Sequence, residues 1–209
     1  MPAAGPVLYP STRGVPVTFE LPTFDWITLQ KQAAHEFGAR VAAITDWSAP
    51  TPDTEWSVRD LVRHIVVEQQ WIPPLLAGLS ILEAKRSIAP LGTDLAAEWN
   101  THSVLAATAW ANTPALSPVT LSYDTVTATD YLREQVSDVT IHAWDLARAT
   151  AADEVLDVLL VEAVWSVFEP QKDTLEASGL FASPIGLSDD APLQSRLLAL
   201  TGRDDRRQF

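Results

Sequence analysis

The chain has 209 residues, an apolar fraction of 47% and a formal net charge of −13. That apolar fraction is enough to bury one sizeable core, and it excludes wholesale disorder. The acidic charge repels phosphate backbones and anionic lipid headgroups, so we expect neither a nucleic-acid partner nor a membrane partner. The chain contains no cysteine. Disulfides, cysteine-ligated metal sites and cysteine nucleophiles are therefore excluded, and thiol chemistry would need a small-molecule thiol.

Residues 1–23 are rich in proline and predict an extended N-terminal arm. They do not resemble a signal peptide, because no charged leader precedes a long apolar run. No stretch of the chain reaches the roughly 18 apolar residues that a membrane span needs. We therefore expect a cytoplasmic protein in which a single domain over 24–209 follows the arm.

Apolar residues at helical spacing predict five helices in that domain. They span 24–44, 58–71 with a shorter piece that continues to residue 85, 94–112, 129–150 and 153–168, and a short helical segment follows in LQSRLLALTG. A short strand pair is predicted around VTLSYDTVTA, between the third and fourth helices. Long helices joined by loops predict an all-α fold, an up-and-down bundle of four main helices with an additional C-terminal helix.

Two local features refine these boundaries. Ser57 and Asp60 match a capping box directly before the apolar run LVRHIVV. Pro73 and Pro74 predict the end of that helix or a kink in it, because proline lacks the N–H donor and clashes with the preceding turn. In the fifth helix, the side chains expected to face inward are Leu156, Leu159, Leu160, Ala163 and Val167.

Two of the four histidines lie where they could ligate a metal ion. His142 follows Asp138 by four residues, so on a helix both side chains leave the same face and can reach one ion. His64 interrupts an apolar stretch of the second helix, and it completes a set of two nitrogens and one oxygen if that helix faces the fourth. Three protein ligands with an open fourth position are typical of catalytic zinc. The spacing alone, however, favours a plainer alternative, a half-buried histidine pair satisfied by hydrogen bonds.

Sequence motifs add a family resemblance to this reading. The segment DTEWSVRDLVRHIVVEQQW resembles the second-helix motif of the mycothiol-dependent maleylpyruvate isomerase N-terminal family, part of the wider DinB-like bundle superfamily. DVTIHAWDLARAT resembles the fourth-helix motif of that family, and DDAPLQSRLLALTGRD resembles the tail of a related actinobacterial group of metal-binding proteins. The resemblance implies a DinB-like bundle in which His64 and His142 ligate metal. It also implies that Asp138 stands where the isomerases carry glutamate.

The resemblance further implies a divalent metal ion, with zinc first and nickel, manganese or iron as alternatives, and a mycothiol-like thiol. The expected function is a thiol-dependent transferase or isomerase that acts on a small electrophilic molecule. The alternative is a metal-binding or interaction module without catalysis. The isomerases add a C-terminal domain, and too few residues remain here after the fifth helix for a full one, so maleylpyruvate isomerisation itself is not expected. The resemblance also leaves a homodimer open beside a monomer.

Other carboxylates lie near the proposed ligands in sequence. Asp60 and Glu68 flank His64 by four residues on either side. Either could orient the imidazole or replace Asp138 as the oxygen ligand, and the plainer alternative for both is a solvated helix face. Asp145, three residues after the second ligand histidine, is expected to orient that histidine or to pair with a nearby arginine, Arg148.

The remaining candidates have mainly structural interpretations. His102 is expected to be half-buried and bonded to a backbone group, and His35 to be exposed. Core packing is expected for most tryptophans. Three of them lie near the motifs, and one or more of these could line the metal site: Trp56, Trp71 and Trp144. The C-terminal segment GRDDRRQF predicts an exposed charged end, with an anion-binding role as the alternative for Arg203, Arg206 and Arg207.

Overall fold

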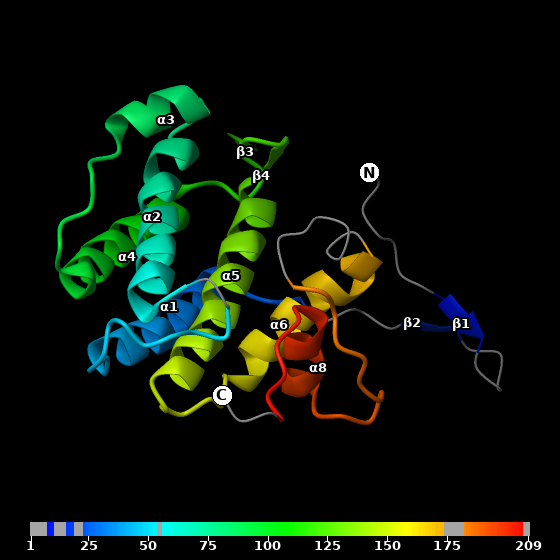
Figure 1. Cartoon of the computed structure of the whole chain (residues 1–209). Helices are drawn as coiled ribbons and strands as arrows, with labels where there is room; N and C mark the ends of the chain where they lie inside the picture. Colours follow the sequence, from blue (N-terminus) through cyan, green and yellow to red (C-terminus); the bar gives the residue numbers. More distant parts are fainter. Residues whose placement is uncertain (1–7, 11–15, 19–22, 54–55, 174–181, 207–209) are drawn as a thin grey trace.

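Figure 1 shows the computed structural model of the chain. The structure describes residues 8–10, 16–18, 23–53, 56–173 and 182–206. Most of the expected arm over 1–23 lies outside the described residues, as does Arg207. Within the arm, β1 (Leu8–Pro10) and β2 (Pro16–Thr18) pair antiparallel, with Tyr9 opposite Val17.

The expected all-α fold is confirmed. The bundle consists of α1 (Trp26–Ala42), α2 (Val58–Leu76), α4 (Leu95–Asn112) and α5 (Ala128–Ala149). The shorter elements are α3 (Ile81–Ser87), α6 (Val158–Phe168), the 3-10 helix η1 (Glu169–Gln171) and α8 (Leu193–Leu200). The expected strand pair is also present, as β3 (Pro118–Thr120) and β4 (Thr125–Thr127) in antiparallel register.

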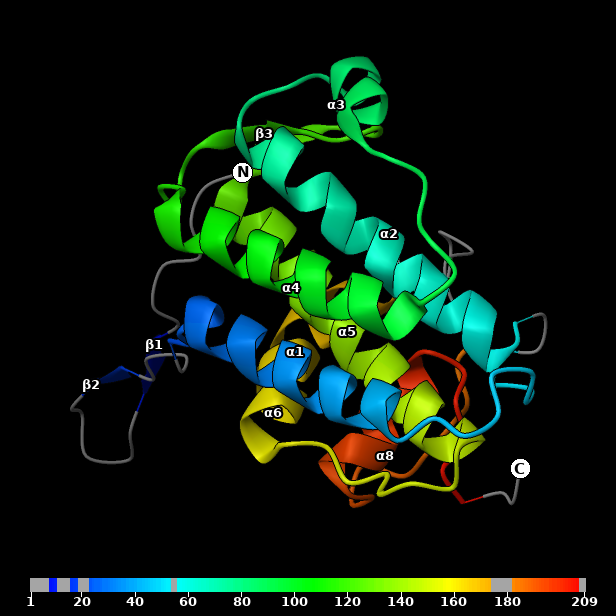
Figure 2. The same cartoon turned by 90° about the vertical axis from the view of Figure 1, so that its left-hand side faces the viewer.

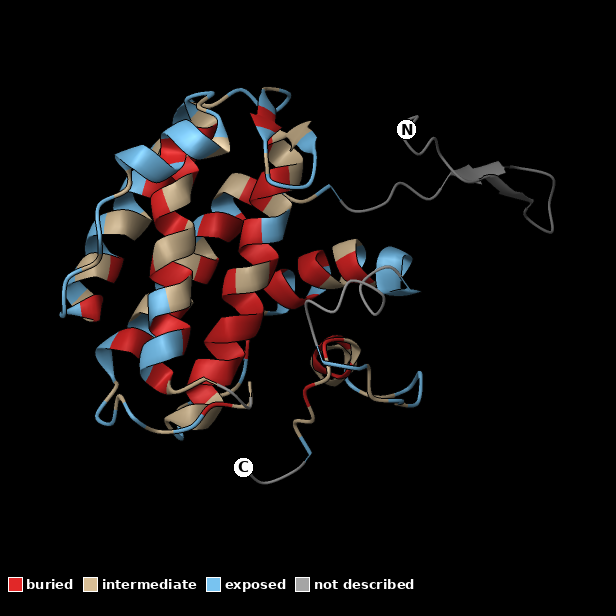
Figure 3. Ribbon diagram, turned by 45° about the horizontal axis from the view of Figure 1, so that its top comes forward, coloured by how far each residue is buried: buried red, intermediate tan, exposed pale blue. Residues whose placement is uncertain are grey.

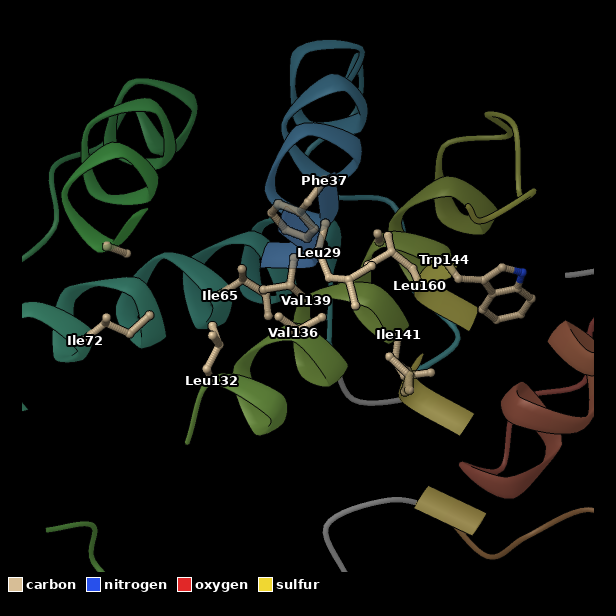
Figure 4. Packing of buried hydrophobic residues seen from close by; sticks show 14 of the residues in the cluster. Leu29, Phe37, Ile65, Ile72, Leu132, Val136, Val139, Ile141, Trp144 and Leu160 are labelled. Carbon is tan, nitrogen blue, oxygen red and sulfur yellow. The ribbon is translucent and has the colours of Figure 1, made fainter. Parts of the chain in front are cut away.

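The helices pack in pairs around a common core. In Figure 2, α1 lies beside α5 and α2 lies beside α4, and α2 also packs along α5. On the far side of α5, α6 packs against that helix and α8 packs against α6 (Figure 1). Figure 4 shows side chains of α1, α2 and α5 meeting in the centre, among them Phe37, Ile65 and Val136, all at most 1% exposed.

Polar side chains determine where most helices begin. A side-chain oxygen at the N-cap accepts a hydrogen bond from a first-turn N–H and so satisfies a donor that has no partner within the helix. Six helices begin this way, with Asp25, Ser57, Ser80, Asp94, Thr127 and Asp157 as the capping residues. The expected capping box of Ser57 and Asp60 is confirmed, and Asp60 is exposed.

Two expected boundaries are wrong. Helix α2 runs through Pro73 and Pro74 to Leu76. Each proline lacks an N–H donor, but its carbonyl group can still accept a hydrogen bond from a later N–H group, so the last turn can form. The Ala77 N–H donates to the Pro73 carbonyl at 3.0 Å. A bend of 119° separates α2 from α3. Helix α6 begins at Val158, later than expected, because the Asp157 side chain caps it there.

One side of α6 faces solvent, contrary to expectation. Leu160 and Ala163 are buried as predicted, as is Leu156 just before the helix, whereas Leu159 is 58% exposed and Val167 is only partly buried. Figure 3 shows that buried residues extend over most of α5, which has neighbours on both sides. Polar side chains on α5 therefore need partners inside the protein.

Among the described residues, no single helix is long and apolar enough to cross a membrane. Only α2 and α3 taken together, across their bend, pass by length and composition.

Candidate metal centre

Helices α2 and α5 bring His64, Asp138 and His142 together. One ring nitrogen of each histidine and one carboxylate oxygen lie within 4.8 Å of one another. His64 Nε2 is 3.5 Å from Asp138 Oδ2, and His142 Nε2 is 3.4 Å from Asp138 Oδ1. The His142 side chain is 6% exposed, whereas those of His64 and Asp138 are 32% and 26% exposed. The group is therefore buried at His142 and more open at His64 and Asp138.

These distances are compatible with a shared metal ion. Two ligands bound at about 2.1 Å around a tetrahedral zinc ion lie roughly 3.4 Å apart, close to both observed separations. Direct N–H···O hydrogen bonds are shorter, roughly 2.7–3.2 Å. The donor set of two imidazoles and one carboxylate also suits zinc and other divalent transition metals. The partial exposure of His64 and Asp138 makes the group accessible from solvent.

Asp145 determines how the His142 ring presents its nitrogens. Asp145 Oδ2 lies 3.0 Å from His142 Nδ1, and Asp145 is fully buried. An ionised carboxylate only accepts hydrogen bonds, so His142 Nδ1 carries the proton and Nε2 keeps its lone pair toward the centre. Burial acts to raise the pKa of Asp145, but Arg203 and His142 together lower it below its usual value. Asp145 therefore remains ionised and acts as the expected orienting residue.

Arg203 is the main site residue that the sequence did not reveal. Its Nε donates to Asp145 Oδ1 at 3.2 Å, and its Nη2 donates to Asp145 Oδ2 at 2.8 Å. Nη1 donates to the Thr201 carbonyl at 2.8 Å, and Nη2 also lies 3.7 Å from Asp53 Oδ2. The expected exposed charged end is thus wrong for Arg203, which is only 7% exposed, because two carboxylates offset the cost of burying its charge. Arg206 is exposed, as expected.

Trp56 covers the two histidines on one side. Its ring centroid lies 4.8 Å from that of His64 and 5.7 Å from that of His142, and it is nearly parallel to the latter at 28°. The other two tryptophans near the motifs lie elsewhere. Trp144 is buried with the Arg148 guanidinium 4.7 Å from its ring, and Trp71 lines a separate cavity.

The carboxylates around the centre control its charge in the absence of metal. Burial acts to lower the pKa of His64, but Asp138, Glu68 and Asp53 together raise it above its usual value. Burial likewise acts to raise the pKa of Asp138, and the two histidines outweigh that effect and lower it. Asp138 is thus an anion between two imidazoles, the form that binds a cation.

Glu68 approaches the centre without joining it. Burial, followed by the Asp138 charge, raises its pKa against the opposing effects of His64 and the Gln135 side chain. Of the oxygen candidates considered, the structure brings only Asp138 within reach of both histidines.

The other two histidines lie away from the centre. His102 is half-buried as expected, but Nε2 contacts side chains, Glu98 Oε2 at 3.1 Å and Gln70 Nε2 at 3.2 Å, rather than a backbone group. His35 is exposed, as expected.

Comparison with known proteins agrees with this architecture. A family model described as the mycothiol maleylpyruvate isomerase N-terminal domain matches residues 31–147, which include the three converging residues. No curated protein matches the chain. A crystal structure of the mycothiol-dependent maleylpyruvate isomerase is similar with a TM-score of 0.64 and 16% identity, over 89% of this chain and 91% of that chain.

At that identity the structural likeness shows the fold alone, which is the expected DinB-like bundle. The match covers most of both chains, so the similarity of fold extends beyond residues 31–147.

Proposed function

Because the chain belongs to the mycothiol maleylpyruvate isomerase N-terminal domain family, we propose that it binds one divalent metal ion and uses a small-molecule thiol in a transferase or isomerase reaction. The proposed metal ligands are His64, Asp138 and His142. The observation that supports this most strongly is the convergence of their ligand atoms within 4.8 Å, beside an open side of the group.

Zinc is the first choice of metal, because two imidazoles and one carboxylate form its usual catalytic donor set. Nickel, manganese and iron are the alternatives. A divalent ion supplies a Lewis acid that lowers the pKa of a thiol or of water toward neutrality.

The chain itself would hold and shield the reacting groups. Asp145 keeps the Nδ1 proton of His142 in place, so that Nε2 faces the centre. Trp56 excludes water from one side of both imidazoles. Asp138 contributes the negative charge that offsets part of the charge of a bound cation. Together these residues would leave an approach for thiol and substrate at the more exposed side chains, His64 and Asp138.

The thiol must come from outside the chain, because the sequence contains no cysteine. We therefore propose a low-molecular-weight thiol of the mycothiol type and an electrophilic small molecule as partners. The charge of −13 is the basis for proposing no nucleic-acid or membrane partner. A cytoplasmic location and a single domain over 24–209 remain part of the proposal.

Elemental analysis of protein purified without added metal tests the metal site. We expect one divalent ion per chain, and we expect His64→Ala and His142→Ala each to lose it. His35→Ala is the matched control, because His35 is exposed on α1 and should leave the metal content unchanged. A wild-type chain that holds no metal, even after incubation with zinc, would contradict the proposal.

A cobalt-substituted sample separates a thiol-dependent enzyme from a closed metal-binding module. Adding a thiol should produce a sulfur-to-cobalt charge-transfer band if the open position accepts the thiol. A cobalt spectrum that does not respond to any thiol would support the module without catalysis.

A further inference from the structure

An open cavity of about 250 Å³ lies between α2, α5, α3 and the β3–β4 hairpin. Figure 2 shows α3 and β3 together beyond one end of α2. The lining residues with polar or aromatic groups are Glu68, Trp71, Tyr123, Tyr131, Glu134 and Gln135. The proposed metal ligands are not among the lining residues, so the cavity is distinct from the candidate metal centre.

The cavity begins about one helical turn from that centre. Glu68 follows His64 by four residues on α2, and Glu134 precedes Asp138 by four residues on α5. Residues four apart lie on one helix face, separated by about 6 Å along the axis. A small molecule in the cavity could therefore extend to the open side of the metal centre.

The lining is negatively charged. Glu68 and Glu134 contribute two carboxyl groups, and no lysine or arginine is among the described residues that line the cavity. Burial raises the pKa of both groups, and a neighbouring aspartate adds to the shift in each case, Asp138 for Glu68 and Asp130 for Glu134. Ionising them without a nearby cation is costly, and a bound cation would offset that cost.

One buried polar atom at the cavity, Gln135 Oε1, has no hydrogen-bond partner among the described residues. Tyr131 is 3% exposed, and its ring packs against Trp110 with centroids 5.3 Å apart. The Glu68 and Glu134 charges add to the effect of burial in raising the pKa of the Tyr131 hydroxyl, and all three residues line the cavity. The Gln135 residue as a whole is 8% exposed, and its side-chain oxygen is the unpartnered atom. Such an atom is usually satisfied by a ligand or water, and here an N–H donor would satisfy it.

We propose that this cavity binds the ammonium group of a small amine, with Glu68 and Glu134 as counter-ions and the rings of Trp71 and Tyr131 as walls. Carboxylates give an ammonium group charge-assisted hydrogen bonds, and aromatic faces attract cations and pack against an apolar body. Where the proposed metal-dependent function also holds, the substrate class becomes an electrophile that carries an amine.

Three aromatic probes of similar size test the charge preference, namely 2-phenylethylamine, 2-phenylethanol and 3-phenylpropionate. Calorimetric titration at neutral pH should detect the amine most strongly, with at least tenfold weaker binding of the alcohol and the acid. Glu68→Gln and Glu134→Gln should each weaken amine binding at least tenfold, and Tyr131→Phe should weaken it less. Glu162→Gln, an exposed carboxylate on α6, makes the same charge change away from the cavity and should leave binding unchanged.

The titrations are run on metal-free and metal-loaded protein, with thermal unfolding of each variant as a check on folding. Amine binding to a chain that takes up no metal would support the cavity and contradict the proposed function. Equal binding of all three probes, a preference for the acid, or equal losses in Glu162→Gln and Glu68→Gln would overturn the cavity proposal.

Discussion

The Arg203 guanidinium donates hydrogen bonds to both carboxylate oxygens of Asp145, at 3.2 and 2.8 Å, although Asp145 lies 58 positions earlier in the chain. The pair joins the turn that follows α8 to the buried face of α5. Since the same carboxylate holds Nδ1 of His142, the C-terminal segment helps to orient a proposed metal ligand.

Asp145→Asn is expected to weaken metal binding by about 10–100-fold, because the charge that fixes the His142 tautomer is lost. The variant should also lose stability, by about 3–5 kcal/mol, because the buried Arg203 loses its main counter-ion. Competition with a chelating dye measures the affinity, and urea unfolding measures the stability.

A double variant separates the two effects. Asp145→Asn with Arg203→Met removes both charges and should recover part of the stability but not the metal affinity. Asp189→Asn is the control for a surface carboxylate, because Asp189 is fully exposed, and it should change neither quantity. Wild-type metal affinity in Asp145→Asn would show that this carboxylate does not orient the ligand.

Removing the metal should lower the melting temperature. A ligand present at 100 times its dissociation constant stabilises the folded state by about 2.7 kcal/mol. For a chain of this size we expect a drop of about 5–10 °C in calorimetry after a chelator is added. His64→Ala should melt at one temperature with and without the chelator. A wild-type melting temperature that responds neither to chelator nor to added zinc would contradict a structural contribution from metal.

The bundle was predictable from sequence because its signals are local. Ser57 and Asp60 mark the start of α2 within four residues, and apolar spacing marks the bundle helices. The pairing of His64 with the fourth helix required one further assumption, that α2 and α5 are neighbours. The four-residue spacing of Asp138 and His142 predicted that these two side chains lie on the same face of their helix.

The errors have a common cause, since they depend on partners distant in sequence. Apart from Glu162 and Ser166, helix α6 is apolar, so its spacing marked the inward face poorly and Leu159 was assigned to that face although it is exposed. Arg203 lies in a run of mixed charges that resembles any solvated end, and its burial depends on Asp145 and Asp53, which come from distant segments. A local sequence pattern cannot predict an ion pair between such distant segments.

Gly38→Ala is expected to destabilise the bundle although alanine favours helices. A Cβ at residue 38 would lie 2.8 Å from Trp99 Nε1, and Trp99 is buried and packed against Phe37 with ring centroids 4.7 Å apart. Overpacking of this kind costs about 1–3 kcal/mol, which exceeds the gain of about 1 kcal/mol in helix propensity. In a Trp99→Phe background the same substitution should become neutral or stabilising in urea unfolding. A stabilising Gly38→Ala in the wild-type background would show that the Trp99 ring can move.

The stability difference between Glu134→Gln and the wild type should depend on pH. Burial and Asp130 raise the pKa of Glu134 above its ordinary value of 4.5, despite the hydrogen bond from Tyr123. The folded state therefore disfavours the ionised form. The resulting loss of stability is complete above the raised pKa and disappears as the pH falls through it toward 4.5.

Glu134→Gln, which has no charge to bury, should melt at a higher temperature than the wild type at pH 7.5, with a difference that shrinks on acidification. Melting curves between pH 7.5 and 4.5 measure this, with Glu162→Gln as the exposed control whose difference from the wild type stays constant. A gap that widens toward low pH would mean that folding lowers the pKa of Glu134, because protonation would then remove a favourable charge from the wild type.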